Sequence, residues 1–198
     1  IALSLVGSEM CIRDRLAVPE EHAQRLILKM DPGSAFGTGS HPTTRLCLEA
    51  LEQKPPADLR VADLGCGSGV LGLASLALGA RQVLSVDTDS LAVSATTDNA
   101  ALNGLSMDEL RVRQGSVEVL ENLLEAQPAD LLLCNILAPV IEALAPRFRA
   151  VLRPGGRGLL SGLLVDQAPR LTHVLEGLGW QVRPLAAQGR WGMLEIQR

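Results

Sequence analysis

Apolar residues occur in two kinds of pattern, which alternate along most of this chain. Short continuous apolar runs are typical of buried strands, and longer segments with apolar positions at helical spacing are typical of helices. Strands are predicted at 59–64, 83–86, 110–113, 130–134 and 158–160. Helices are predicted at 70–78, 91–102, 117–124, 140–152 and 168–178.

Further elements stand at the two ends of this series. They are a strand at 26–28, a helix from Thr43 or Thr44 to Leu51, a turn at 153–156 and a hairpin-like pair of strands at 180–183 and 193–196. Strands that alternate with helices predict an α/β fold whose mostly parallel sheet is covered on both faces. Ligands bind such sheets beyond the carboxyl ends of the strands, so a site is expected just after the strand at 59–64.

Composition restricts the classes of partner. A length of 198 residues suits one α/β domain, and 47% hydrophobic residues is within the range of globular proteins. The net charge is -4, Lys and Arg are scattered singly, and the chain has two Phe, two Trp and no Tyr. Nucleic-acid binding usually needs a basic face or aromatic rings that stack on bases, so a direct nucleic-acid partner is disfavoured.

The four cysteines predict neither a metal site nor a disulfide framework. None forms a C-x-x-C pair and none has a histidine at ligand spacing, and isolated thiols suit a reducing compartment such as the cytoplasm. The longest apolar stretch, 70–80, is far shorter than the roughly 18 residues that a membrane span needs. No membrane association is therefore expected.

The clearest chemical signal is a glycine-rich turn between the strand at 59–64 and the next helix. It reads DLGCGSG from Asp63 to Gly69, and residues 65–69 form what we call the glycine loop. Gly65 and Gly67 would let a cofactor approach the backbone closely, and the helix beyond offers free N–H groups. Asp87 ends the following strand, where an acid can accept both ribose hydroxyls of an adenosine-containing cofactor.

Two cofactor classes fit this loop, S-adenosylmethionine and NAD(P). The second fits because Gly67 through Gly72 also match G-x-G-x-x-G, with Asp87 20 residues beyond the first glycine. Asp63 favours the first, since a carboxylate there could hold the amino group of a methionine moiety and would repel a pyrophosphate. A second glycine-rich segment just upstream, which a nicotinamide enzyme does not need, favours the same interpretation.

Four blocks of sequence resemble a known family in their order and spacing: DPGSAFGTGSHPTT (31–44), VADLGCGSG (61–69), SVDTD (85–89) and LLCNILA (132–138). From about Asp31 to its end, the chain is similar to the bacterial ribosomal protein L-eleven methyltransferases. The resemblance implies a Rossmann-like class I methyltransferase fold with a seven-stranded sheet. It also implies methyl transfer from S-adenosylmethionine to lysine and N-terminal amines of a large-subunit ribosomal protein.

The resemblance implies roles for individual residues as well. Thr44 and Gly65 would contact the cofactor, and Asp87 would take its ribose. Asn135 would lie at the methyl-transfer end of the site, and Phe36 would belong to a flap over the bound cofactor.

Asn135 also suits a catalytic role on chemical grounds. An amine must lose a proton before it attacks a methyl group, and a lysine with a pKa of about 10.4 is rarely neutral at pH 7. Carboxamide and carbonyl oxygens after the fourth strand of the series can accept the N–H bonds of the amine and orient its lone pair. Catalysis would then rest on positioning, without an obligatory side-chain base.

Simpler roles stay open for the same residues. Asn135 and Thr44 could cap helices. His41, which precedes a proline, is more often structural than catalytic at such a position. Cys66 and Cys134 flank the expected site, and nothing in the sequence marks either as an activated nucleophile, so small buried fillers are favoured.

Members of the family carry an N-terminal domain that recognises the ribosomal protein, and little of this chain precedes Asp31. Residues 1–15 are expected to be a non-native or assembly-derived segment, 16–30 a linker remnant and 31–198 the methyltransferase catalytic domain. Docking of the ribosomal protein is therefore expected to be weakened. Three other functions stay open: a small-molecule amine methyltransferase, an NAD(P)-dependent oxidoreductase, and a module that binds cofactor without turnover.

Overall fold

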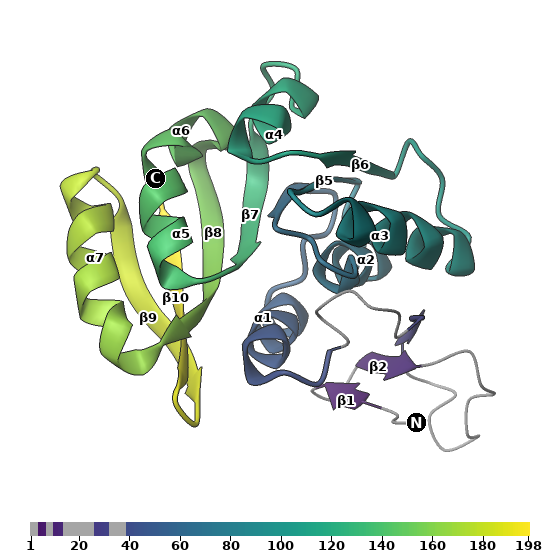
Figure 1. The fold of residues 1–198 in the computed structure, drawn as a ribbon, viewed down its shortest axis with the longest axis horizontal. Helices are drawn as coiled ribbons and strands as arrows, with labels where there is room; N and C mark the ends of the chain where they lie inside the picture. The colour runs from purple at the N-terminus through teal and green to yellow at the C-terminus, as the bar shows by residue number, and fades with distance from the viewer. Residues whose placement is uncertain (1–3, 7–9, 14–25, 32–38) are drawn as a thin grey trace.

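The computed structural model describes residues 4–6, 10–13, 26–31 and 39–198, and a seven-stranded sheet forms its centre (Figure 1). In spatial order its strands are β6 (Leu110–Gln114), β5 (Gln82–Asp87), β4 (Arg60–Leu64), β7 (Ala129–Asn135), β8 (Leu152–Leu164), β10 (Trp191–Gln197) and β9 (Gln181–Gln188). The pairs from β6 to β8 are parallel, and β10 runs antiparallel to both of its neighbours. The predicted α/β fold with a mostly parallel seven-stranded sheet is confirmed.

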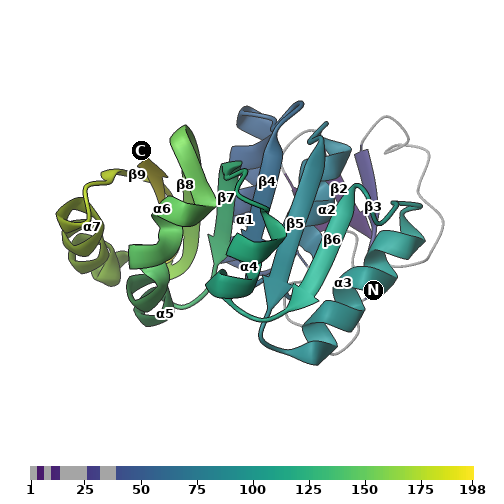
Figure 2. The same ribbon diagram turned by 90° about the horizontal axis from the view of Figure 1, so that it is seen from above.

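Helices cover both faces of this sheet. They are α1 (Pro42–Gln53), α2 (Val70–Ala77), α3 (Ser90–Leu102), α4 (Val117–Leu123), α5 (Ala138–Leu144), α6 (Phe148–Val151) and α7 (Ala168–Gly177). Figure 2 shows α4 to α7 on one side of the sheet and α1 and α2 on the other. In the part of the chain that the structure describes, none of the helices is long and apolar enough to cross a membrane.

The central strands are apolar without interruption because both of their faces are buried. Along β4, Val61 belongs to the apolar cluster on the side of α1 and α2, whereas Ala62 and Leu64 belong to the cluster on the side of α4 to α7. Successive side chains of a strand point to opposite faces, so each face of the sheet receives its own apolar layer. This is why the strands appear in the sequence as short apolar runs and not as alternating patterns.

The predicted turn at 153–156 is wrong, because these residues lie inside β8. The pairing of β8 with β7 jumps from Ala129↔Leu152 to Leu131↔Arg157, so the residues between them bulge out of the register. Gly155 has a φ of 76°, a left-handed conformation that glycine adopts without strain. Turn-forming residues therefore serve a bulge here and leave the strand continuous.

The predicted helix at 140–152 is divided into three pieces. Helix α5 ends at Leu144, a 3-10 turn occupies Ala145–Arg147, and α6 follows. Pro146 lies in this turn, and proline has no N–H group with which to continue an α-helical ladder.

The final strand pair is confirmed, although β9 and β10 are both longer than predicted.

A small second sheet lies at the N-terminal side of the molecule (Figure 1). It consists of β1 (Ser4–Val6), β2 (Met10–Arg13) and β3 (Leu26–Lys29), with β1 antiparallel and β3 parallel to β2. Strand β3 confirms the prediction at 26–28, and its Leu28 joins the apolar cluster that contains α1 and α2. The non-native origin expected for residues 1–15 stays a prediction.

Candidate functional site

Two adjoining hollows lie at the carboxyl ends of the parallel strands. The first has a volume of about 230 Å³ and is lined by residues that end or follow β4, β5, β6 and β7: Leu64, Gly65, Gly67, Asp87, Thr88, Gly115, Ser116, Asn135, Ile136, Val140 and Leu144. Strand β4 pairs with β5 on one side and with β7 on the other, so the strand order reverses at this point. The first hollow lies where the strand pattern predicted a ligand site.

The second hollow has a volume of about 560 Å³ and is lined by His41, Thr43, Thr88, Asn135, Ile136, Leu137, Val140, Gly162 and Trp191. Thr88, Asn135, Ile136 and Val140 line both hollows. The two spaces are therefore neighbours, and Asn135 stands at their boundary.

The glycine loop forms the floor of the first hollow with three residues in the left-handed conformation. Gly65, Gly67 and Gly69 have φ values of 79°, 55° and 83°. A Cβ at Gly65 would lie 2.4 Å from Cγ2 of Ile136, so the tight approach of the 135–137 segment requires glycine there. Gly72, the third glycine of the dinucleotide pattern, faces the interior near Val83 and Ser85 and does not line either hollow.

Asp87 is fixed at the edge of the first hollow by backbone N–H groups. Its Oδ2 accepts a hydrogen bond from N of Gly67 at 2.9 Å, and its Oδ1 accepts one from N of Asp89 at 3.0 Å. A carboxylate has two lone pairs on each oxygen, so both oxygens keep the capacity to accept hydroxyl groups. Asp89 itself caps α3 by accepting from N of Leu91, as its position before the helix suggests.

Asn135 is oriented by Thr44, which the sequence placed in the same site from a distant block. Nδ2 of Asn135 donates to Oγ1 of Thr44 at 3.2 Å, and Thr44 is fully buried in the first turn of α1. With its amide nitrogen used in this way, Asn135 directs its carbonyl oxygen elsewhere. A capping role is not observed, because the residue before α5 is Leu137 and no side chain caps that helix.

His41 has a structural role in this geometry. Its Nδ1 accepts from N of Thr43 at 3.4 Å and lies 2.8 Å from Oγ1 of Thr43, which makes His41 the N-cap of α1. The ring also contacts Trp191 edge to face, with 4.9 Å between ring centroids.

Asp63 is buried beneath the glycine loop and does not line the first hollow. Burial raises the pKa of its carboxyl to about 7, a backbone N–H of Gly72 lowers it, and the charge of Asp87 raises it further. Oδ2 of Asp63 and Oγ of neighbouring Ser85 have no hydrogen-bond partner among the described residues. Contact between Asp63 and a bound cofactor, as the sequence suggested, stays a prediction.

The cysteines near the site are buried thiols. Burial raises the pKa of Cys47 to about 12 and also raises the pKa values of Cys66 and Cys134. Thiols in such surroundings are not activated as nucleophiles, in agreement with the interpretation of Cys66 and Cys134 as fillers. Within the described ranges, no three His, Cys, Asp or Glu side chains gather in a way that could hold a metal ion.

Several lining residues escaped the sequence analysis. Gly115 and Ser116 follow β6, so the rule that sites form at strand ends could have found them. Trp191 and Gly162 come from β10 and β8, far along the chain, and no local motif marks them. Phe36, expected in a flap, lies outside the described residues.

Comparison with known proteins gives consistent matches over the whole fold. The sequence profile described as ribosomal protein L11 methyltransferase (PrmA) matches residues 5–198. A ribosomal protein L11 methyltransferase of Parasynechococcus marenigrum is 70% identical over 183 residues, which are 92% of this chain and 63% of that protein. The chain therefore spans less than two thirds of the length of this curated relative.

Two solved structures are similar to this one. A ribosomal protein L11 methylase from Lactobacillus delbrueckii subsp. bulgaricus superposes with a TM-score of 0.86 at 31% identity, covering 100% of this chain and 99% of that one. A 16S rRNA N2 methyltransferase from T. thermophilus gives a TM-score of 0.66 at 24% identity, covering 83% of this chain and 45% of that one. The second likeness shows a shared fold.

Proposed function

The chain belongs to the ribosomal protein L11 methyltransferase family, and on that premise we propose that it binds S-adenosylmethionine and methylates amines of that ribosomal protein. The proposed acceptors are lysine side chains and the N-terminal amine. The observation that carries the proposal is the position of Asn135 between the two hollows, with its amide nitrogen bonded to Thr44.

The first hollow has the chemistry that an adenosine-containing cofactor needs. Leu64, Ile136 and Leu144 supply apolar walls suited to a base. Asp87 supplies acceptors suited to the ribose hydroxyls, and the backbone of Gly65 and Gly67 leaves room that a Cβ would fill.

The second hollow would receive the acceptor amine. When bound, S-adenosylmethionine supplies a methyl group on a positively charged sulfur. The carbonyl oxygen of Asn135 would accept an N–H bond of the neutral amine and aim its lone pair at the boundary between the hollows. Apolar lining by Leu137, Val140 and Trp191 would disfavour the charged ammonium form and hold the alkyl stem.

Binding of the cofactor is tested by titration calorimetry of the chain with S-adenosylmethionine and, separately, with NAD. Binding of S-adenosylmethionine alone is expected. Binding of NAD alone would overturn the proposal in favour of an oxidoreductase.

The role of Asn135 is tested by methylation assays of the ribosomal protein, of basic peptides and of small amines. Asn135→Ala should lower kcat by about 100-fold, since misplacing a reacting group has effects of that size. Asn122→Ala, an exposed asparagine on α4, is the matched control and should leave kcat unchanged. An active wild type whose kcat survives Asn135→Ala would remove Asn135 from the mechanism, and turnover of small amines alone would favour a small-molecule methyltransferase.

We further propose that the ribosomal protein docks weakly on these 198 residues alone, because the curated relatives extend beyond the matched region. A full-length relative is therefore the positive control for the methylation assay. The cytoplasm, where a ribosomal acceptor is made, is the proposed compartment. Full activity of the 198-residue chain beside the longer relative would contradict weak docking.

A further inference from the structure

Helix α3 packs against the glycine loop with polar side chains. Thr96 and Asn99 are buried on this helix, with 0% and 1% of their surface exposed, and Asn103 follows just beyond its last turn. Positions three and four residues apart lie on one side of a helix, so these three side chains form a stripe. Buried polar groups must be hydrogen-bonded, and the stripe bonds to backbone groups of two separate segments, besides the bonds of Thr96 to Sγ of Cys66 and of Asn103 to the carbonyl of Asn99.

The first segment is the glycine loop. Oγ1 of Thr96 donates to the carbonyl of Gly67 at 3.0 Å, and Nδ2 of Asn99 donates to the carbonyl of Ser68 at 2.9 Å. A Cβ at Gly69 would lie 2.8 Å from Cγ2 of Thr96, so the helix touches the loop directly. Gly67 is thereby held from both sides, by Thr96 at its carbonyl and by Asp87 at its N–H.

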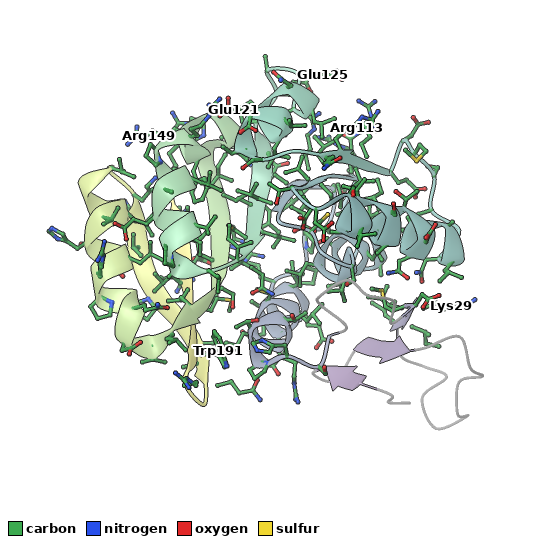
Figure 3. The ribbon with its side chains drawn as sticks, viewed as in Figure 1. Lys29, Arg113, Glu121, Glu125, Arg149 and Trp191 are labelled. Atoms are coloured by element: carbon green, nitrogen blue, oxygen red, sulfur yellow. The ribbon has the colours of Figure 1, made fainter. Side chains whose placement is uncertain are left out.

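The second segment is Lys29–Asp31 at the end of β3. Oδ1 of Asn99 accepts from N of Asp31 at 2.7 Å. Asn103 binds both backbone groups of Lys29, accepting from its N at 3.0 Å and donating to its O at 2.7 Å. Figure 3 labels Lys29 at the side of the molecule where β3 lies beside the end of α3.

We propose that Asn99 and Asn103 are positioning residues that couple the Lys29–Asp31 segment to the cofactor-binding glycine loop. The inference rests on the proposed function for the identity of the ligand. One buried amide, that of Asn99, bonds to Asp31 with its oxygen and to Ser68 with its nitrogen. Moving either segment leaves a buried polar group without a partner, which is unfavourable. Such coupling is reciprocal, so cofactor binding and the order of the upstream segment stabilise each other.

Asn103→Ala tests the coupling, because Asn103 contacts neither the glycine loop nor either hollow. We expect S-adenosylmethionine to bind roughly 5-fold more weakly, at the lower end of typical coupling strengths. Thr97→Ala is the control, since exposed Thr97 lies on the same helix and its hydroxyl, within the described part of the chain, donates to the carbonyl of Val93 of that helix. Equal affinities in the two variants would overturn the coupling.

Asn99→Asp separates the two bonds of the buried amide. A carboxylate can still accept from N of Asp31 but cannot donate to the carbonyl of Ser68. Loss of that bond should weaken cofactor binding by roughly 5-fold, while hydrogen exchange at the Asp31 amide stays slow. Fast exchange at Asp31 together with unchanged cofactor affinity would contradict the assignment.

Hydrogen exchange without cofactor keeps this test independent of the proposed function. In Asn103→Ala, the amide of Gly67, which donates to Asp87, should exchange roughly 5-fold faster than in Thr97→Ala. A merely local role would accelerate exchange at Lys29 alone, and that result would overturn the coupling. Failure of the wild type to bind S-adenosylmethionine would instead refute the proposed function.

Discussion

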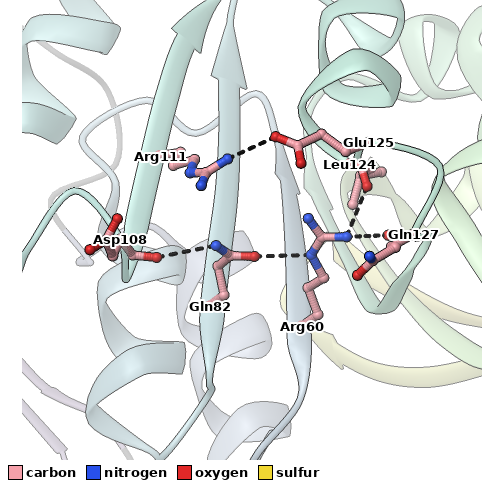
Figure 4. A network of polar contacts seen from close by, with 7 residues as sticks. All are labelled: Arg60, Gln82, Asp108, Arg111, Leu124, Glu125 and Gln127. Atoms are coloured by element: carbon pink, nitrogen blue, oxygen red, sulfur yellow. Dashed lines mark hydrogen bonds and ion pairs between the residues drawn. The ribbon is translucent and has the colours of Figure 1, made fainter.

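The two ends of the central sheet are built from different chemistry. At the carboxyl end, glycines, an asparagine and one partly exposed acid, Asp87, line the two hollows. At the amino end, arginines bind carbonyl and carboxylate groups in networks that join neighbouring strands (Figure 4). None of the ion pairs among the described residues involves a residue that lines either hollow.

Arg60 illustrates the amino end. It is 7% exposed, and its guanidinium donates to the carbonyls of Leu124 and Gln127 and to Oε1 of Gln82. Gln82 in turn donates to the carbonyl of Asp108, so one chain of bonds crosses β4, β5 and the approach to β6 (Figure 4).

Asp130 extends the same arrangement to β7 and β8. It accepts from N of Arg60 and pairs with Arg153. Burial alone would raise the pKa of Asp130, but these hydrogen bonds and the positive charge of Arg153 lower it. Arg60 and Asp130 thus have partners for their buried polar atoms, whereas Oδ2 of Asp63 and Oγ of Ser85, near the carboxyl end, have none among the described residues. The contrast indicates that stability and ligand binding are located at opposite ends of the sheet.

The largest effect should come from Arg60→Met, which removes the centre of the amino-end network. Leaving several buried acceptors without a donor should lower the free energy of unfolding by about 3 kcal/mol. Urea unfolding measures this loss. Calorimetry under conditions in which the variant is folded should find unchanged cofactor affinity. A weaker cofactor affinity of the folded variant would contradict the assignment of stability and ligand binding to opposite ends of the sheet.

Asp87→Ala is the counterpart at the carboxyl end. Loss of hydrogen bonds to a charged group should weaken S-adenosylmethionine binding by about 1.5–3 kcal/mol, roughly 10- to 150-fold in Kd. Asp98→Ala, an exposed acid on α3, changes the net charge equally and should leave Kd unchanged. If both variants bind equally well, Asp87 does not hold the cofactor.

Asp63→Asn should remove a pH dependence of stability that the wild type owes to a buried carboxyl near the carboxyl end. The pKa of Asp63 is raised from 3.8 to about 7, so its contribution to stability is present below pH 4 and is lost as the pH rises to 7. Between pH 5 and 6, the wild type should lose stability faster than the variant, by about 1.4 kcal/mol per pH unit. Urea unfolding at these pH values measures both free energies of unfolding. If they change equally with pH in the wild type and the variant, the pKa of Asp63 is not raised.

Arg111→Met should have the smallest effect, although Arg111 lies in the same amino-end region as Arg60 (Figure 4). Its ion pair with Glu125 spans 3.0 Å between side chains that are 36% and 67% exposed. Such pairs contribute little in water, so the loss should stay below about 0.5 kcal/mol by urea unfolding. If Arg111→Met lowered the free energy of unfolding as much as Arg60→Met, the charge of these arginines, and not their burial, would determine their contribution to stability.

The local sequence predicted those elements whose own residues have a characteristic pattern. The strands β4 to β7 and the helices α2 to α4 follow from apolar runs and helical spacing, and the glycine loop follows from its composition. The segment 153–156 was predicted wrongly, because Pro and Gly favour turns and bulges alike and only pairing with β7 distinguishes them. The polar stripe of α3 was also missed, since Thr and Asn on a helix appear solvent-facing until the partner segments are known.

The sequence by itself determined the α/β fold, the position of the glycine loop after β4 and the resemblance that proposed Thr44, Asp87 and Asn135 as residues of one cofactor and methyl-transfer site. Each of these depends on short-range patterns or on a block of adjacent residues. Tertiary structure alone decided that Asp63 is buried beneath the loop, that Trp191 faces the second hollow, and that Asn99 joins two distant backbone segments. Burial and hydrogen-bond partners depend on which distant segments lie next to one another in the fold, and local sequence patterns do not show this.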